Sequence, residues 1–398
     1  MERLSKRIST ISPSLTLAIS AKAKQMKAAG ENVISFSVGE PDFNTPAHIA
    51  EAAVEAIQKG QTKYTPSSGL QELRRAVAEK FKRDNDLDYE PSQIIVSSGA
   101  KHSIFNACYA LLNEGDEVII PAPYWLTYPE VVKVLGGVPV IVQAEKERGF
   151  KITPEQLEAA ITPRTKLFIF NSPSNPTGAV YSEGEVRALA EVLERADVFV
   201  LADEIYEKLV YGNTKPFSIA RCSERMKELT VTVNGVSKSY AMTGWRIGYL
   251  AAPKDIAKAI DSFQSHATSN PNSIAQYAAI RALSSPEAEL QKMVAEFARR
   301  RKAMLERISK MQGVYCVVPE GAFYVMLVIS GVYGKKCGAR EIKSSIDFAD
   351  ALLSEEKVAV IPGAAFGADD CVRLSYSLSM EDMLEGLDRI ERFLKDLC

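Results

Sequence analysis

The feature that most constrains the fold is a regular alternation of short apolar runs and amphipathic segments between residues 46 and 284. Most of the apolar runs are hydrophobic throughout, so we expect strands that are buried on both faces. Such strands separated by helices are typical of a largely parallel sheet. We predict strands at 93–97, 117–120, 138–142, 166–171, 198–202, 230–233 and 248–251, and helices at 101–113, 128–135, 154–161 and 183–195.

The first helix of this region is predicted to open at Thr45-Pro46, to run to about Lys59 and to stop at Gly60. Threonine is a good N-cap, and proline is tolerated in the first helical turn. We therefore expect Thr45 to cap the helix.

The pattern changes near residue 285. Glu287–Met311 is one long amphipathic segment, which is followed by short apolar runs at 323–328, 359–361 and 372–376 and by helical patterns at 345–355 and 380–395. This order predicts a second, smaller α+β domain. The predicted fold class is α/β: a large domain, 46–284, with a mostly parallel central sheet between helices, and a small domain built from 1–45 and 285–398.

Composition excludes several classes of protein. The 398 residues carry a net charge of −2 without a basic stripe, so we expect no nucleic-acid partner. No apolar run approaches the roughly 20 residues of a membrane helix, and the basic N-terminus lacks the apolar core of a secretory signal. The three histidines and six cysteines show no metal-site spacing. We therefore predict reduced cysteines, a cytoplasmic location and no metal site.

The loop Ser237–Tyr249 carries the clearest chemical signal. Its sequence, SKSYAMTGWRIGY, places Lys238 among small polar residues and Arg246 eight positions later. A lysine amine can form a Schiff base with an aldehyde cofactor, and an arginine can bind a phosphate group. The pair suggests an enzyme that uses pyridoxal 5′-phosphate.

Two other polar groups follow predicted strands. Asp203 ends the apolar run 198–202, where α/β sheets place their ligands, and Tyr206 comes three residues later. Asn175 follows another strand in a rigid Asn-Pro turn. A pyridine cofactor needs a carboxylate that keeps its ring nitrogen protonated, and Asp203 is the candidate.

Several blocks of the chain, in order, resemble one known family. SPSNPTG (Ser172–Gly178), ADEIY (Ala202–Tyr206) and SKSYAMTGWRIGY are similar to the signature blocks of fold-type I aspartate aminotransferases, in the bacterial β subgroup. GEPDFNTP, KYTPSSG, PYW and VRLSY extend the resemblance over nearly the whole chain.

For the cofactor, the resemblance implies pyridoxal 5′-phosphate bound in the large domain. Lys238 would carry it and later move the substrate proton, while Asp203 would pair with the ring nitrogen. The other cofactor contacts that the resemblance implies are Tyr206 and Asn175 on the ring oxygen, Trp125 stacked on the ring, and Arg246, Gly99, Ala100, Lys101 and Ser237 around the phosphate. Tyr64 is implied to reach the phosphate of a neighbouring subunit, and hence a homodimer.

For the substrate, the resemblance implies that Arg373 grips the α-carboxylate, with Gly39, Trp125 and Asn175 beside it. The α-subgroup arginine for a second carboxylate is absent, since Ser265 and His266 precede Ser269-Asn270-Pro271. The β subgroup uses a lysine instead, for which Lys101 is the candidate. Ser14 and Thr16 are expected to add contacts if the N-terminal segment closes.

The implied reaction is ping-pong transfer of the amino group from L-aspartate to 2-oxoglutarate, which gives oxaloacetate and L-glutamate. A Lys101 that faces solvent would instead favour alanine or aromatic substrates. Prephenate use is linked to a lysine at the position of Ser12, so the serine counts against it. A β-lyase on the same fold and a ligand-sensing regulator are further alternatives.

Overall fold

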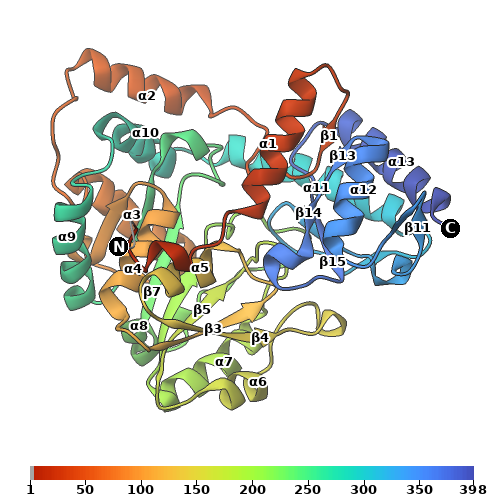
Figure 1. Ribbon diagram of the computed structural model, residues 1–398. Helices are drawn as coiled ribbons and strands as arrows, with labels where there is room; N and C mark the ends of the chain where they lie inside the picture. Colours follow the sequence, from red (N-terminus) through yellow and green to blue (C-terminus); the bar gives the residue numbers. More distant parts are fainter. Residues whose placement is uncertain (1–3) are drawn as a thin grey trace.

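The computed structural model describes residues 4–398, and its largest element is a seven-stranded sheet (Figure 1). The strand order is β2-β8-β7-β6-β5-β3-β4, in which β8 alone runs antiparallel to its neighbours. The bounds are β2 Ile94–Ser97, β3 Glu117–Ala122, β4 Val138–Gln143, β5 Thr165–Asn171, β6 Phe199–Asp203, β7 Thr230–Gly235 and β8 Gly248–Ala251. Each lies within about two residues of its predicted range, and the mostly parallel α/β sheet is confirmed.

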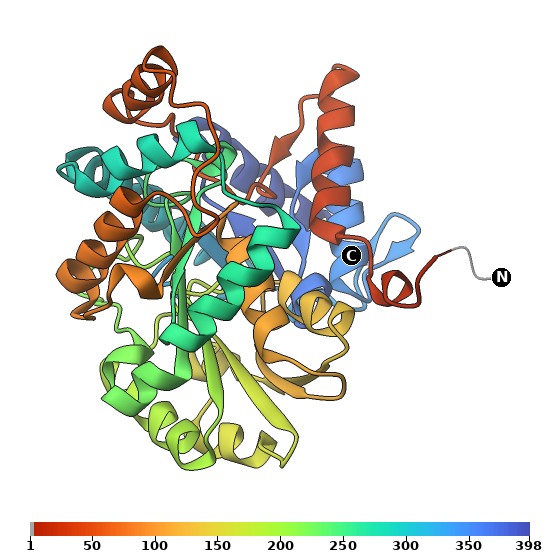
Figure 2. The same cartoon turned by 90° about the vertical axis from the view of Figure 1, so that its left-hand side faces the viewer.

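Helices cover both faces of this sheet (Figures 1 and 2). Along β5, Leu167 and Ile169 pack in one apolar cluster with α4 and α9, while Phe168 and Phe170 pack in another with α7. The strand is therefore buried on both sides, which explains its unbroken apolar run. The helices of this part are α2 Ala47–Gln58, α3 Gln71–Asn85, α4 Ala100–Leu111, α5 Thr127–Val134, α6 Pro154–Ala160, α7 Glu183–Ala196, α8 Glu224–Leu229, α9 Lys254–Ala267 and α10 Ser273–Ser284.

The predicted cap of α2 is wrong. The helix begins at Ala47 after Pro46, and no side chain caps its first turn. The Thr45 hydroxyl instead donates to the carbonyl of Ala241 at 2.7 Å and accepts the indole N–H of Trp245 at 2.9 Å. Thr45 therefore ties the chain before α2 to the loop that carries Lys238.

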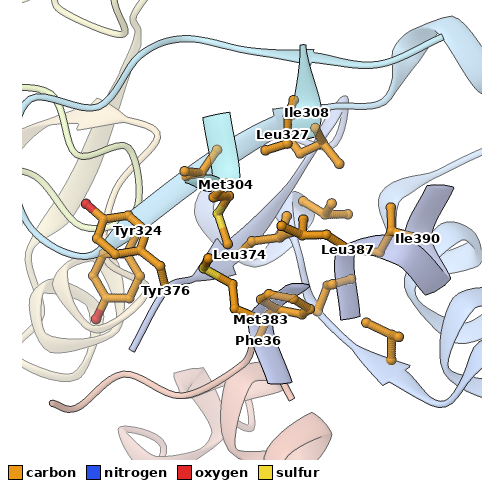
Figure 3. Packing of buried hydrophobic residues seen from close by; sticks show 14 of the residues in the cluster. Phe36, Met304, Ile308, Tyr324, Leu327, Leu374, Tyr376, Met383, Leu387 and Ile390 are labelled. Atoms are coloured by element: carbon orange, nitrogen blue, oxygen red, sulfur yellow. The ribbon is translucent and has the colours of Figure 1, made fainter. Parts of the chain in front are cut away.

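A second group of elements packs around its own core. It contains α1 Leu15–Ala28, β1 Ile34–Ser35, α11 Ala288–Ile308, β9 Tyr315–Cys316, β10 Tyr324–Val328, β11 Lys336–Cys337, β12 Arg340–Glu341, α12 Ser345–Glu356, β13 Val358–Ala359, β14 Ile361–Pro362, β15 Cys371–Ser375 and α13 Met380–Asp396. Figure 3 shows Phe36, from the N-terminal part, among Met304, Leu374 and Met383.

The single strand predicted at 359–361 is two strands. β13 pairs in parallel with β1, and β14 joins the sheet β14-β15-β10-β9. The first pairing joins the N-terminal segment to the C-terminal elements. The boundaries of the two domains stay a prediction, and residues 1–3 of the small one lie outside the described residues.

The N-terminal segment spans both groups of elements. η1 (Ile8–Thr10) lies against α5 of the large group, whereas α1 packs against β13 and β14. Ser12–Ser14 thus crosses between them. Within residues 4–398, no helix is long and apolar enough to cross a lipid bilayer.

Candidate active site

A cavity of about 1090 Å³ lies where the carboxyl ends of β5 and β6 meet the N-terminal segment and β15. It brings together thirteen of the residues predicted from the sequence: Ser14, Thr16, Gly39, Ala100, Lys101, Trp125, Asn175, Asp203, Tyr206, Ser237, Lys238, Arg246 and Arg373. These residues come from segments more than 350 positions apart, so the site is a product of the tertiary fold.

Lys238 lies in the tight loop that follows β7. The loop is held by backbone hydrogen bonds from Tyr240 to Val236 and from Met242 to Ser237. The Lys238 amine donates to the carbonyl of Gly39 at 2.5 Å. Burial lowers the pKa of this amine to about 8, an effect that Glu40 opposes and Arg373 reinforces. About a tenth of the amine is therefore neutral, and nucleophilic, at pH 7, far more than for an exposed lysine.

Asp203 is the last residue of β6 and lies opposite Asn171 of β5. The carboxylate is buried, and it accepts a hydrogen bond from the Tyr128 hydroxyl at 2.7 Å and one from the backbone N–H of Ile205 at 3.2 Å. Burial raises the pKa of Asp203 to about 6, although both hydrogen bonds act to lower it. The site thus holds a carboxyl group that remains a strong proton acceptor.

Arg373 enters the cavity from β15 and forms hydrogen bonds with two other segments of the chain. Its guanidinium donates to Asn175 Oδ1 at 2.9 Å and to the carbonyl of Ser37 at 3.1 Å. The buried Nε has no hydrogen-bond partner in the described chain. Because a guanidinium carries five N–H groups, donors remain for an anion in the cavity.

Arg246, which lies two residues before β8, contacts the chain at the start of α4. It adopts a left-handed backbone conformation (φ 55°), and its guanidinium donates to the carbonyl of Thr243 at 2.8 Å. Gly99, which precedes α4, has φ 89°, and a Cβ atom there would lie 2.3 Å from Arg246 Nη2. The glycine therefore lets the guanidinium approach the N-terminus of α4. The guanidinium and the helix N-terminus together form a cradle for an anion.

Lys101 and Trp125 form another wall. The Lys101 amine lies 4.8 Å from the centre of the Trp125 ring. Burial, and then the charge of Arg246, lower the pKa of this amine, and no carboxylate within residues 4–398 counteracts them. Lys101 is thus an uncompensated cation in the cavity.

The N-terminal segment closes one side of the cavity. Ser14 caps α1, and its hydroxyl lies 3.0 Å from that of Thr16. The backbone N–H of Ser12 donates to Glu130 of α5 at 2.8 Å. Ser12, Ser14 and Thr16 all line the cavity.

Two predicted residues do not line this cavity: Gly99, which lies beside the Arg246 guanidinium at its edge, and Tyr64. The Tyr64 side chain is 90% exposed on the connection between α2 and α3. Any role in a site would require a second molecule.

Two tyrosines with direct contacts to the site were missed by the sequence analysis. Tyr128, on α5, donates to Asp203, and Tyr324, at the start of β10, pairs its hydroxyl with that of Tyr206 at 2.9 Å. Tyr128 follows Trp125 by three residues, and Tyr324 lies in the apolar run 323–328. Both tyrosines could be seen in the sequence near predicted site residues or strands. The hydrogen-bond partner of each hydroxyl, however, depends on contacts between segments that are distant in the sequence.

Comparison with known proteins agrees with this geometry. The sequence pattern of the family described as "Aminotransferase class I and II" matches residues 31–390. The chain belongs to the aminotransferase class I and II family. This membership accounts for the lysine, carboxylate and arginines that meet in one cavity, and it implies pyridoxal 5′-phosphate as the cofactor.

Similar members of the family are known from several bacteria. The chain is 52% identical to the aspartate aminotransferase of Bacillus subtilis (strain 168) over 99% of both chains. It is 50% identical to the aspartate/prephenate aminotransferase of Cereibacter sphaeroides over the full length of both. The crystal structure of the aspartate aminotransferase from Rhizobium meliloti matches with a TM-score of 0.97, at 45% identity and over 100% of each chain.

The residues of the cavity fit pyridoxal 5′-phosphate. The cofactor needs an amine, a carboxylate for its ring nitrogen and an anion site. Lys238 and the buried Asp203 supply the first two. The cradle of Gly99, Arg246 and the N-terminus of α4, which a side chain at residue 99 would fill, supplies the third.

Proposed function

We propose that this class I and II aminotransferase transfers the amino group of L-aspartate to 2-oxoglutarate, by a ping-pong reaction that gives oxaloacetate and L-glutamate. One observation carries the proposal: a single cavity contains the Lys238 amine, the Asp203 carboxyl and two further cations, Arg373 and Lys101. Two cations suit a substrate with two carboxylates. The names of the similar relatives support the same substrate.

In this proposal, the Lys238 amine would hold the cofactor and Asp203 would keep its ring nitrogen protonated. Tyr206 and Asn175 would donate to the ring oxygen, and Trp125 would pack on the ring. The phosphate would be held by Arg246, by the backbone N–H groups of Ala100 and Lys101, and by Ser237. Gly99 leaves room for the guanidinium, while its own N–H donates to the carbonyl of Ser97 at 2.7 Å.

The substrate contacts follow from the same cavity. Arg373 binds the α-carboxylate as a bidentate fork, with Gly39, Trp125 and Asn175 beside it. Lys101 binds the distal carboxylate, whose charge compensates a cation that no carboxylate among residues 4–398 stabilises. Ser14 and Thr16 contribute hydroxyls from the N-terminal segment, which excludes water from the substrate.

The chemistry divides between the cofactor and the protein. Pyridoxal phosphate, when bound, supplies an electron sink for the carbon that loses its proton. Lys238 Nζ removes the proton from the substrate α-carbon and returns it during the transfer. Its depressed pKa suits this role, because a general base works best when its pKa is near the operating pH.

We also propose a homodimer in which Tyr64 completes the phosphate site of the partner. The 90% exposure of the Tyr64 side chain supports a contact outside its own chain. Tyr109, which is half exposed, stacks on Phe263 with ring centres 3.8 Å apart and adds apolar surface for such a contact. The cytoplasmic location stays a prediction.

Aspartate/prephenate activity is the second candidate, since a relative 50% identical carries that name. Ser12 lines the cavity and supplies no positive charge there, which counts against prephenate. A β-lyase would need no second cation, so Lys101 favours transfer over elimination.

The experiment is a substrate panel on the protein loaded with pyridoxal phosphate. Aspartate, glutamate, alanine, phenylalanine and prephenate are compared, and borohydride reduction followed by peptide mapping locates the cofactor. We expect aspartate with 2-oxoglutarate to react fastest, the label to lie on Lys238, and Lys238→Ala to lose at least about 10²–10⁴-fold in turnover. Near-normal turnover of that variant, or release of pyruvate and ammonia without a keto acid, would contradict the proposal.

A further inference from the structure

Tyr324 contacts two residues of the cavity, Arg373 and Tyr206. It opens β10 and pairs with Ser375 of β15, so it shares a face of that sheet with Arg373, two residues from Ser375. The Arg373 guanidinium carbon lies 4.3 Å from the centre of the Tyr324 ring. This distance is that of a cation–π contact, which is strengthened by burial.

The hydroxyl of Tyr324 contacts Tyr206. It lies 2.9 Å from the Tyr206 hydroxyl and forms no other hydrogen bond among residues 4–398. Figure 3 shows this hydroxyl pointing away from the apolar side chains of the small-domain core. The Tyr324 ring is fully buried and packs 4.6 Å from that of Phe323. The ring is therefore held in place, and the direction of its hydroxyl is fixed.

The direction of the hydrogen bond follows from proton counting. A phenol has one proton to donate and lone pairs that accept. If Tyr206 gives its proton to a group in the cavity, the bond between the two hydroxyls must be donated by Tyr324. Burial raises the pKa of both phenols, so both protons are present near neutral pH. A donor that itself accepts a hydrogen bond is strengthened by it.

We propose that Tyr324 is a positioning residue with two separable actions: its hydroxyl directs the Tyr206 proton into the cavity, and its ring holds the Arg373 guanidinium for the substrate carboxylate. This inference rests on the proposed function, because Tyr206 and Arg373 are there the cofactor and substrate contacts. Tyr324 itself acts through these two residues.

The two actions call for two variants. Tyr324→Phe removes the hydroxyl and keeps the buried ring, whereas Tyr324→Met removes the ring and keeps most of the side-chain volume. Tyr181→Phe is the matched control, because Tyr181 is a buried tyrosine whose hydroxyl accepts the N–H of Ile152 and does not line the cavity. Thermal unfolding of each variant checks that the chain is folded.

The first readout is the spectral pH titration of the Lys238–cofactor linkage. A weaker donation from Tyr206 stabilises the deprotonated, negatively charged ring oxygen less. We therefore expect Tyr324→Phe and Tyr324→Met to raise the midpoint by about half a unit. Tyr181→Phe should titrate like the parent protein. A Tyr324→Phe midpoint equal to that of the control would overturn the action of the hydroxyl.

The second readout is the affinity of succinate, a dicarboxylate that has no amino group to transfer. Tyr324→Phe keeps the cation–π contact and should bind succinate within about twofold of the parent protein. Tyr324→Met should bind it about 3–30-fold more weakly. Equal affinities of the two variants would overturn the action of the ring.

Failure of this inference is distinct from failure of the proposed function. A parent protein that shows no titrating linkage, and no borohydride label on Lys238, refutes the proposed function. A parent protein that titrates and is labelled, together with Tyr324 variants that behave like it, refutes only the role of Tyr324.

Discussion

Lys101 is the residue that we propose to set the substrate specificity of the cavity. It lies in the first turn of α4, where a lysine facing solvent would be ordinary, yet its amine lines the cavity above Trp125. Burial and the charge of Arg246 both lower its pKa, so both disfavour the charged amine. A substrate carboxylate would relieve this cost, because opposite charges attract strongly at short range in a dry site.

We expect Lys101→Ala to lose aspartate activity by about 10–100-fold in kcat/KM and to spare alanine, which has no distal carboxylate. Steady-state kinetics with both amino acids measure the ratio. The matched control is Lys166→Ala, since Lys166 also lies over an aromatic ring, 4.9 Å from Phe199, but outside the cavity. Equal losses on aspartate and alanine would show that Lys101 is no distal clamp.

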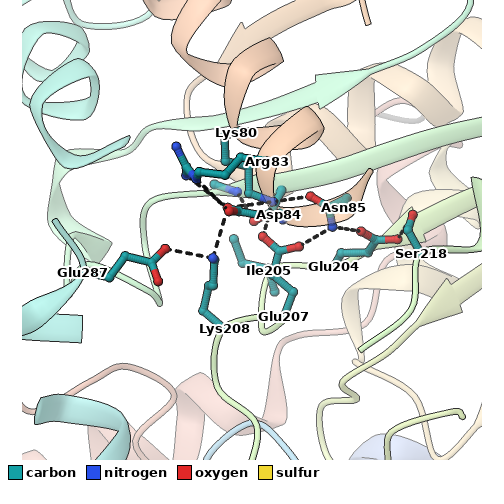
Figure 4. A network of polar contacts seen from close by, with 12 residues as sticks. Lys80, Arg83, Asp84, Asn85, Glu204, Ile205, Glu207, Lys208, Ser218 and Glu287 are labelled. Atoms are coloured by element: carbon teal, nitrogen blue, oxygen red, sulfur yellow. Dashed lines mark hydrogen bonds and ion pairs between the residues drawn. The ribbon is translucent and has the colours of Figure 1, made fainter. Parts of the chain in front are cut away.

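At the scale of elements, the turn after β6 is held from behind by a buried polar network (Figure 4). Glu204 accepts from Ser218 at 2.6 Å, and Glu207 accepts from Asn85 at 2.7 Å and pairs with Lys80. Lys80 and Asn85 lie on α3, so this helix fixes the turn that presents Asp203 and Tyr206 to the cavity. Lys208 extends the network to Asp84 at 3.0 Å and to Glu287, before α11, at 2.8 Å.

Glu204 is the member of this network whose negative charge is least favourable. Burial, and then repulsion from Glu207, raise its pKa to about 8. A carboxyl whose pKa is higher in the folded than in the unfolded chain binds more protons when folded. Stability is therefore lost as the pH rises from about 4.5, the ordinary value, to about 8.

We expect Glu204→Gln to remove that loss, since glutamine keeps the shape of a neutral carboxyl. Its melting temperature should exceed that of the parent protein at pH 9 and approach it at pH 5, with a gain in the free energy of unfolding of up to about 5 kcal/mol at the higher pH. Glu289→Gln on the exposed face of α11 is the control. A variant less stable than the parent protein at pH 9 would show that Glu204 is charged and well compensated there.

At the scale of the whole molecule, the cavity exists because distant parts of the chain meet. Arg373 of β15 donates to Asn175 after β5 and to Ser37 after β1, and Lys238 donates to Gly39. A substrate gripped by Arg373 would therefore touch both groups of elements. Tyr64 faces outward on the same molecule, and its proposed partner is a second copy of the chain.

Subunit mixing tests this assembly. If Tyr64 completes the partner's site, mixed dimers of Lys238→Ala with Tyr64→Ala contain one native site. Random mixing should then restore about a quarter of the parent activity, because half of the dimers are mixed and one of their two sites is intact. Lys238→Ala mixed with Asp203→Ala is the control, since both defects lie in the same chain's site and no native site forms. Recovery no greater than in this control would place Tyr64 outside the partner's site.

Much of the fold could be predicted because its signals are local. Strands buried on both faces leave continuous apolar runs, so β3, β5 and β6 lie within about two residues of the predicted ranges. The two-residue strand β1 was not predicted, and β13 and β14 were predicted as one strand, because the pairing of β1 with β13 joins positions more than 300 residues apart. Thr45 is a residue type that often caps helices, but its hydroxyl donates instead to the carbonyl of Ala241 in the Lys238 loop.

The sequence by itself determined the α/β sheet, the family and the chemical groups of the site, because residue type and spacing carry that information along the chain. The tertiary structure alone decided which groups touch: Tyr128 with Asp203, Tyr324 with Tyr206 and Arg373, and α3 with the turn after β6. The physical reason is that hydrogen bonds and charge interactions act over a few ångströms in space, whatever the separation of their partners along the chain.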